Sequence, residues 1–155
     1  MKKQRFTSKK LFRALCSPHI WRYGYINPSS SYMGRPDLTT LIEPKKGGYI
    51  IDDLNTIGLC SFKKDKKGKM IYSGDVLQND NGLNFEVRFG QYAMYCPVDD
   101  CMMENVGFYL VAKGYYEDMP LGPTEKYATI IGNIHDNPEL KISDEFRNAA
   151  ELSGR

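Results

Sequence analysis

An alternation of apolar and polar residues between positions 83 and 89 constrains the fold of this chain more than any other feature. The apolar members are Leu83, Phe85, Val87 and Phe89, and the polar members are Asn84, Glu86 and Arg88. Successive side chains of a β-strand point to opposite faces, so a period of two predicts a strand with one buried face. The preceding segment 79–82 ends in Asn-Gly, which readily adopts the left-handed backbone of tight hairpin turns. We therefore expect a half-buried strand that follows a hairpin turn.

Short apolar or aromatic segments of similar character recur along the chain. They span residues 20–26, 49–51, 56–60, 70–72, 76–77, 92–96, 106–112 and 127–134. Only the C-terminus has a helical pattern, with Ser143 as the expected N-cap and acidic residues in the first turn. Many short strands with few helices predict a mainly β (β-rich α+β) fold. We expect a small barrel-like or strongly bent antiparallel sheet with a short C-terminal helix.

The length of 155 residues suits one ordinary domain, and no internal repeat or composition shift marks a boundary. We expect a single domain over 1–155, with a basic, flexible start at 1–9 and a C-terminal helix and tail at 141–155. Residues 27–48 are rich in Pro, Ser and Gly and predict a long loop that includes a short strand or helical turn near Leu38 to Ile42. The sequence leaves the role of this loop open.

The chain contains no recognisable signal peptide and no apolar stretch near the roughly 20 residues that cross a bilayer. We therefore expect a cytoplasmic protein with no membrane partner. In that compartment the four cysteines are expected to be reduced thiols, not a disulfide framework.

Three segments form a recognisable set: Lys10 to Ala14 (KLFRA), Asp65 to Val76 (DKKGKMIYSGDV) and Ile130 to Leu140 (IIGNIHDNPEL). Together they resemble parts of the YopX family, small proteins carried mostly by bacteriophages and prophages. Their order and spacing agree with the family, so the resemblance covers roughly residues 10–140. It implies a β-rich fold, a mobile-element origin and a bacterial host cell, and it implies no catalytic residue.

The residues shared with the family pattern have a structural interpretation. They are Phe12, Arg13, Gly68, Ile71, Tyr72, Gly74, Asp75, Gly132, Asn133, Asn137 and Pro138. Gly68 and Gly74 permit turns, Asp75 can accept hydrogen bonds from nearby backbone N–H groups, and Asn137-Pro138 closes a strand. We interpret these motifs as determinants of the fold and not as a reactive site.

Sulfur and imidazole side chains form the one pattern with metal-ligand spacing. Cys16-x₂-His19 and Cys96-x₄-Cys101 together hold the three thiolates and one imidazole of a closed tetrahedral zinc site. The alternative is that the cysteines are small buried hydrophobic residues, as free cysteines commonly are. We expect no cofactor and keep a zinc-stabilised domain as a hypothesis.

Catalytic motifs are absent from the sequence. It has two histidines and no Gly-x-Ser-x-Gly, Walker-type, dinucleotide-binding, EF-hand or His-Glu-x-x-His pattern. We therefore expect a protein that is not an enzyme.

Two binding roles remain. A lysine-rich segment is the candidate for nucleic-acid binding, through Lys63, Lys64, Lys66, Lys67 and Lys69. The net charge is only +2, because acidic clusters such as Asp99-Asp100 nearly cancel the basic ones. The 11 tyrosines suit a protein contact surface. We expect an accessory module that binds another protein or assembles with copies of itself, with nucleic-acid binding as the alternative.

Overall fold

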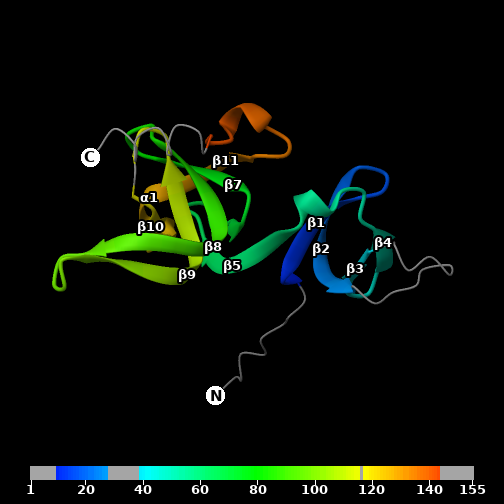
Figure 1. The fold of residues 1–155 in the computed structure, drawn as a ribbon. Coiled ribbons are helices and arrows are strands. Elements are labelled where there is room, and N and C mark those ends of the chain that lie inside the picture. The colour runs from blue at the N-terminus through cyan, green and yellow to red at the C-terminus, as the bar shows by residue number, and fades with distance from the viewer. Residues whose placement is uncertain (1–9, 28–38, 116, 144–155) are drawn as a thin grey trace, which may run out of the picture. The chain divides into compact units, whose positions relative to one another are not determined.

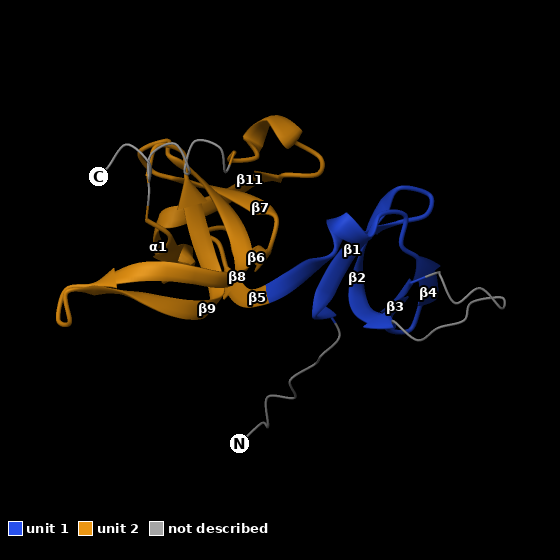
Figure 2. Cartoon of the chain, viewed as in Figure 1, with its two compact units in different colours: residues 1–60 blue, residues 61–155 orange. Residues whose placement is uncertain are grey.

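A computed structural model describes residues 10–27, 39–115 and 117–143. The chain divides into two compact units, residues 1–60 and 61–155 (Figure 2). That the whole chain behaves as a single domain stays a prediction. The basic start at 1–9 and the helix expected after Ser143 lie outside the described residues.

Unit 1 is an antiparallel meander in which each strand pairs with the next along the chain (Figure 1). Its strands are β1 (Phe12–Cys16), β2 (Ile20–Asn27), β3 (Thr40–Glu43) and β4 (Gly47–Ile50). A 3-10 turn at Leu54–Thr56 leads into β5 (Gly58–Lys64), whose first residues pair with β1. The strands expected at 20–26 and 49–51 are confirmed. Within the expected loop at 27–48, β3 is the short strand allowed near Leu38 to Ile42, and β4 begins in the last two residues.

A small apolar cluster holds unit 1 together. Its buried members are Ala14, Cys16, Leu41 and Ile51. Close contact between strands is possible because Gly24 has no side chain: a Cβ there would lie 1.9 Å from the carbonyl oxygen of Ile42. The guanidinium carbon of Arg22 lies 3.5 Å from the ring centroid of Tyr49. Its Nη1 forms an ion pair with Oε2 of Glu43, at 3.1 Å.

Unit 2 contains a five-stranded antiparallel sheet in the order β10-β9-β8-β7-β11 (Figure 1). Its elements are β6 (Met70–Tyr72), β7 (Asp75–Asn79), β8 (Asn84–Cys96), β9 (Cys101–Ala112), β10 (Met119–Pro120), α1 (Thr124–Tyr127), β11 (Ala128–Asn133) and a 3-10 turn at Pro138–Leu140. The mainly β, antiparallel prediction is confirmed. The barrel-like alternative is not, because the sheets stay open over the part of the chain that the structure describes. No helix in these residues is long and apolar enough to cross a membrane.

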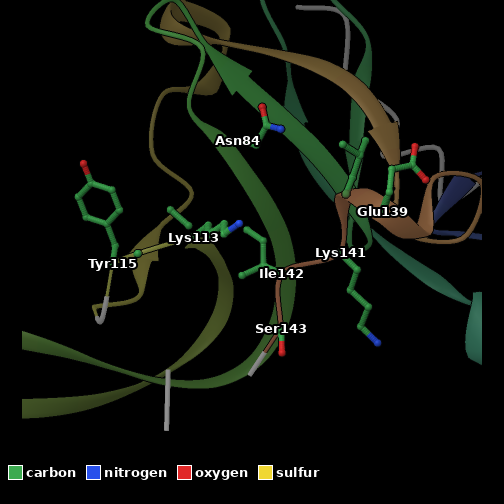
Figure 3. A pocket seen from close by; sticks show the side chains of 10 residues that line it. Asn84, Lys113, Tyr115, Glu139, Lys141, Ile142 and Ser143 are labelled. Carbon is green, nitrogen blue, oxygen red and sulfur yellow. The ribbon is translucent and has the colours of Figure 1, made fainter. Parts of the chain in front are cut away.

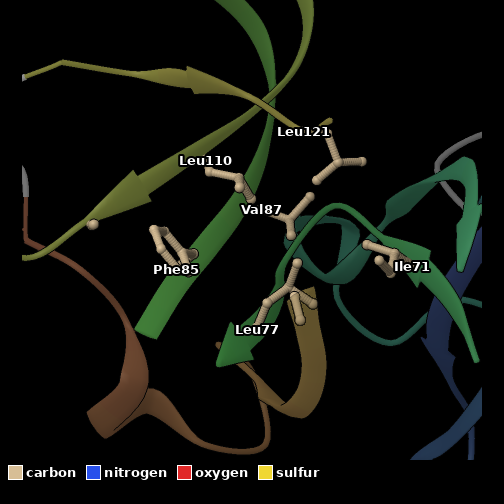
Figure 4. Close-up of a cluster of buried hydrophobic side chains, with 8 residues drawn as sticks. Ile71, Leu77, Phe85, Val87, Leu110 and Leu121 are labelled. Atoms are coloured by element: carbon tan, nitrogen blue, oxygen red, sulfur yellow. The ribbon is translucent and has the colours of Figure 1, made fainter. Parts of the chain in front are cut away.

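The core of unit 2 forms where β8 pairs with β7 on one side and β9 on the other. Phe85 and Val87 project from β8 and meet Leu77 of β7 and Leu110 of β9 (Figure 4). Both β8 residues are buried, so the expectation that Phe85 and Val87 face the core is confirmed. Leu83, at the edge of the cluster, is only partly buried.

Two expectations for this strand are wrong. Phe89 is 49% exposed, although Val87 on the same face of β8 is buried. Its ring packs on its cross-strand partner Phe108, with the ring centroids 4.8 Å apart. Glu86 was expected to face water but is buried. Its Oε1 accepts the N–H of Ile142 at 3.2 Å, and its Oε2 pairs with Arg88. Arg88 in turn donates to the carbonyl of Ile142 at 2.9 Å. The polar face of β8 therefore binds segment 141–143 through both side chains.

Asp65 joins two parts of unit 2 that are far apart in the sequence. Its buried carboxylate accepts backbone N–H groups from Lys67 at 2.9 Å, Lys69 at 2.8 Å and Ile130 of β11 at 3.0 Å. Burial by itself raises the pKa of this carboxyl, but the three backbone donors outweigh it and hold the pKa below its usual value. An ionised carboxylate therefore fixes the turn after β5 against β11.

We expect Asp65→Asn to lower the free energy of unfolding by about 2 kcal/mol, because the amide loses the charge and one acceptor oxygen. Since the folded-state pKa is lowered, this stabilisation is complete above the unfolded-state pKa of about 4 and is lost as the pH falls through the folded-state pKa. Urea unfolding followed by circular dichroism, at neutral pH and at about pH 3, measures both effects.

The matched control is Asp80→Asn, which removes an exposed carboxylate that pairs with Lys66 at 2.7 Å. Exposed pairs contribute little, so we expect a loss below about 1 kcal/mol. Equal losses in the two variants would contradict the role of Asp65.

Candidate functional site

Strands β8 and β9 extend well beyond the rest of their sheet. β7 pairs with β8 only over Asn84–Glu86, and β10 pairs with β9 only at Tyr109 and Leu110. The two long strands nevertheless stay paired with each other as far as Cys96 and Cys101. Residues 90–107 form a two-stranded ribbon that projects from unit 2 (Figure 1). We call this segment the β8–β9 arm; within unit 2 its outer edges have no strand partner among the described residues.

A glycine pair marks the base of the arm. Gly90 lies opposite Gly107, with φ angles of 152° and 155°, a conformation that residues with side chains rarely adopt. An added Cβ would meet open space at either position, so the backbone conformation and not crowding requires glycine. The ring of Tyr92 reaches past this pair and stacks on Tyr109, with centroids 5.0 Å apart and planes 21° apart.

The arm exposes large apolar side chains. Those at least two-fifths exposed, together with Phe89 at its base, are Tyr95, Val98, Met102, Met103 and Val106. Val98 and Val106 are the extreme cases, at 89% and 77%. Cross-strand partners share a face, so Tyr95 and Met102 project from one face while Met103 projects from the other with Met94. Clustered exposed apolar side chains are typical of binding surfaces, and methionine adapts readily to a partner.

The arm is also acidic. Between residues 89 and 112 the sequence has Asp99, Asp100 and Glu104 and no basic side chain. At the tip, Tyr95 donates its hydroxyl to Asp100 at 2.6 Å. This hydrogen bond, with smaller contributions from desolvation and the charge of Glu117, raises the pKa of Tyr95. The tip therefore combines fixed negative charge with apolar contact area.

The lysines predicted to bind nucleic acid lie together on the end of β5 and the turn that follows it. All five side chains are exposed: Lys63, Lys64, Lys66, Lys67 and Lys69. Two of them have partners, since Lys63 donates to the carbonyl of Gly122 at 2.7 Å and Lys66 pairs with Asp80 at 2.7 Å. We call this set the lysine turn; it is a compact basic surface held in shape by Asp65.

The structure places the predicted zinc ligands differently in the two units. In unit 2, Cys96 and Cys101 are direct cross-strand partners at the tip of the arm. In unit 1, Cys16 is buried and His19 lies in an exposed turn, where its backbone N–H donates to Asp52. Burial raises the pKa of the Cys16 thiol, which disfavours the thiolate that zinc binds. Across residues 10–27, 39–115 and 117–143, no three potential metal ligands cluster, and zinc binding stays a prediction.

The central family motif forms a tight corner between β6 and β7. Ile71 and Tyr72 are buried, and Asp75 accepts the N–H of Tyr72 at 2.8 Å. Gly74 has a φ of 92° and donates its N–H to the carbonyl of Val87 at 2.8 Å. In the preceding turn Gly68 has a φ of 79°. These contacts support the interpretation of the motif as a fold determinant.

The C-terminal motif locks the end of β11. Asn137 donates its N–H to the carbonyl of Asn133 at 2.8 Å, and its side chain packs where Gly132 leaves room. A Cβ on Gly132 would lie 2.4 Å from Oδ1 of Asn137. Oδ1 of Asn133 accepts hydrogen bonds from the backbone N–H groups of His135 and Asp136. Pro138 then starts the 3-10 turn at Pro138–Leu140. In the N-terminal motif, Phe12 and Arg13 both lie on β1. Arg13 is buried, and its guanidinium carbon Cζ lies 5.0 Å from the ring centroid of Trp21.

Unit 2 also has a cavity of about 460 Å³, which is lined in part by segment 141–143, the segment that contacts Glu86 (Figure 3). Its polar lining includes Asn84, Lys113, Glu139 and Lys141. None of the site residues predicted from the sequence lines it. The cavity reaches the ends of the described segments at Tyr115 and Ser143, and its lysines and glutamate are ordinary surface groups. We therefore regard the arm as the stronger candidate site.

Sequence reasoning missed the arm. It predicted strands at 92–96 and 106–112 as ordinary members of the sheet, joined by an acidic segment. Three signals were present in the sequence: the glycines at 90 and 107, the run Cys101-Met102-Met103, and 24 residues, 89–112, without a basic side chain. None of these signals predicts by itself that the pairing with β7 and β10 ends before the arm begins.

A model of the family described as YopX protein matches residues 53–141 of the chain. The match covers the central and C-terminal motifs and the whole β8–β9 arm. The expected resemblance from residue 10 is thus supported from residue 53 onward, and Phe12 and Arg13 lie outside the match. No curated protein matches the chain.

We expect Gly90→Ala to destabilise unit 2 by about 1–3 kcal/mol, because alanine does not tolerate a φ of 152°. The variant should also lose the tyrosine stack, which near-ultraviolet circular dichroism detects beside urea unfolding. Gln91→Ala is the control, since Gln91 is exposed and makes one hydrogen bond to Glu104. A stability equal to that of the control would show that position 90 does not require glycine.

Proposed function

The chain belongs to the YopX protein family, and from this premise we propose that it is a non-catalytic, self-assembling interaction module of phage or prophage origin. We propose further that it acts in the cytoplasm of the bacterial host. The β8–β9 arm is the contact surface. One observation carries the proposal: the arm projects from unit 2 with apolar side chains exposed on it, and no described strand of that unit pairs with its outer edges.

The physical argument begins with the stability of the arm. An isolated two-stranded ribbon is only marginally stable in water, since it buries little apolar surface of its own. Its unpaired edges also offer backbone donors and acceptors to another chain. A partner that covers Met102, Val106 and Tyr95 removes apolar surface from water and pairs an edge at the same time.

Charge complementarity favours a second copy of the same chain as the partner. The arm has three acidic side chains and no basic one, whereas the lysine turn exposes five lysines. Opposite potentials speed encounter and select the register of docking. An arm that docks on the lysine turn of the next copy makes a head-to-tail contact. Such contacts close into rings or continue as filaments, which suits an assembly function.

Nucleic-acid binding is the second candidate, favoured by the gathering of five exposed lysines on one turn. It differs from self-assembly in needing the lysine turn but not the arm. The acidic arm weighs against it, because negative charge on the same unit repels phosphates.

Charge exchange between the two surfaces tests the assembly directly. The arm variant is Asp99→Lys with Glu104→Lys, and the turn variant is Lys64→Glu with Lys67→Glu; all four side chains are exposed. In sedimentation velocity we expect wild type to assemble as its concentration rises and each variant to need at least about tenfold more protein. An equimolar mixture of the two variants should assemble again, since each supplies the surface that complements the other.

The outcomes of this experiment separate the hypotheses. A wild-type chain that stays monomeric up to about 100 μM would refute self-assembly. Assembly that survives both variants would place the contact elsewhere. Binding of a DNA duplex at low salt that is lost in the turn variant but kept in the arm variant, without assembly of the wild type, would favour the nucleic-acid role.

Apolar contact is tested separately by Val106→Ser with Met102→Ser on the arm. Truncating side chains at the centre of an interface commonly costs more than 1 kcal/mol, so we expect assembly to weaken about tenfold or more. The control is Ile131→Ser on β11, which removes a side chain of 40% exposure from the same unit. If the control weakens assembly as much as the arm variant does, the arm is not the apolar contact surface.

A further inference from the structure

Two cysteines end the β8–β9 ladder as direct partners. Cys96 is the last residue of β8 and Cys101 the first of β9, and they occupy one cross-strand position before the loop at 97–100. Both are free thiols. Directly opposed residues of an antiparallel pair have Cα atoms about 4.5 or 5.5 Å apart, depending on the hydrogen-bonding pattern. Both values lie within the range of about 4.4–6.8 Å that disulfides span.

The two thiols are also accessible, unlike the other cysteines of the chain. Cys101 is exposed and Cys96 is half-buried, whereas Cys16 and Cys60 are buried. Within the arm, Cys96 makes a long contact, at 3.6 Å, with the carboxylate of Asp99 in the loop that joins the two cysteines. Accessible thiols next to a resolving cysteine are the ones that react with oxidants.

We propose that Cys96 and Cys101 form a redox-active dithiol, which closes into an intramolecular disulfide at the tip of the arm. The oxidant is a low-molecular-weight disulfide such as oxidised glutathione. This site does not depend on self-assembly, because both cysteines belong to one hairpin of one chain.

The exchange proceeds in two steps that balance. The exposed Cys101 thiol loses its proton and attacks one sulfur of the external disulfide, whose S–S bond breaks; one glutathione leaves and takes up a proton. Cys96 then loses its proton and attacks Sγ of Cys101, which forms the protein disulfide and releases the second glutathione. In sum the protein gives up two electrons and two protons, and the external disulfide becomes two thiols.

The position of the pair gives the reaction its specificity. Because the β8–β9 ladder holds Cys96 beside Cys101, the second step is intramolecular, with an effective thiol concentration in the millimolar range or above. A reduced cytosol keeps such a pair as thiols, and cytosolic disulfides are commonly transient or redox-sensing. The closed form ties the first and last residues of the tip, between which Asp99 and Asp100 lie.

The test uses the full chain, reduced and then equilibrated with mixtures of reduced and oxidised glutathione. Intact mass and peptide mapping after alkylation are the readouts. We expect the mass of a single chain that has lost two hydrogen atoms. Peptide mapping should show Cys96 and Cys101 joined to each other by a disulfide. A mixed glutathione adduct should stay below about a tenth of the wild-type protein, because the second step outruns external thiols.

The variant Cys96→Ser removes the resolving thiol and is the matched control. It should stop at the mixed disulfide on Cys101, with at least about tenfold more adduct than wild type. The mapping of the wild type needs no variant and so stands even if the variant misfolds. A stable glutathione adduct on wild type, disulfides that link two chains only, or a Cys96–Cys101 pair that stays reduced in excess oxidised glutathione would each overturn the proposal.

Discussion

The continuous antiparallel register between β8 and β9 is the constraint on which unit 2 depends. It runs without a break from Phe85 opposite Ala112 to Cys96 opposite Cys101. At one end the ladder is part of the five-stranded sheet and contributes Phe85, Val87 and Leu110 to the core. At the other end no further strand lies beside it among the described residues of unit 2. A single hydrogen-bonded pair of strands therefore anchors the arm in the core and carries it beyond the sheet.

Buried carboxylates hold the surroundings of this ladder in place. Asp65 fixes the lysine turn to β11 through three backbone N–H groups, and Glu86 with Arg88 fixes segment 141–143 to the outer face of β8. Buried charge is tolerated in proteins only when hydrogen bonds replace lost water, and both carboxylates meet that condition. Asp65 is the first residue of the central family motif and Ile130 the first of the C-terminal one, so this carboxylate joins the two motifs directly.

The two proposed activities use the same architectural device. A β-hairpin places residues of its two strands opposite each other with fixed spacing, whether they are the two thiols at the tip or the apolar pairs along the arm. The arm brings apolar area and negative charge, and the lysine turn brings positive charge from another hairpin of the same unit. Assembly and redox chemistry are separable, since the first needs two chains and the second needs one.

The sequence by itself determined the local conformations. The alternation at Phe85 and Val87 was enough to predict a strand with one buried face, and the turns at Gly68 and Gly82 followed from glycine's access to positive φ. What lies opposite a strand is a long-range property that no local pattern records. Only the tertiary structure showed that Phe89 is exposed although Val87 on the same face is buried, and that Glu86 is buried where residues 141–143 contact it. The arm was decided in the same way: the period-two pattern fixes which side chains share a face, but burial depends on a neighbouring element, and along the arm unit 2 supplies none among its described residues.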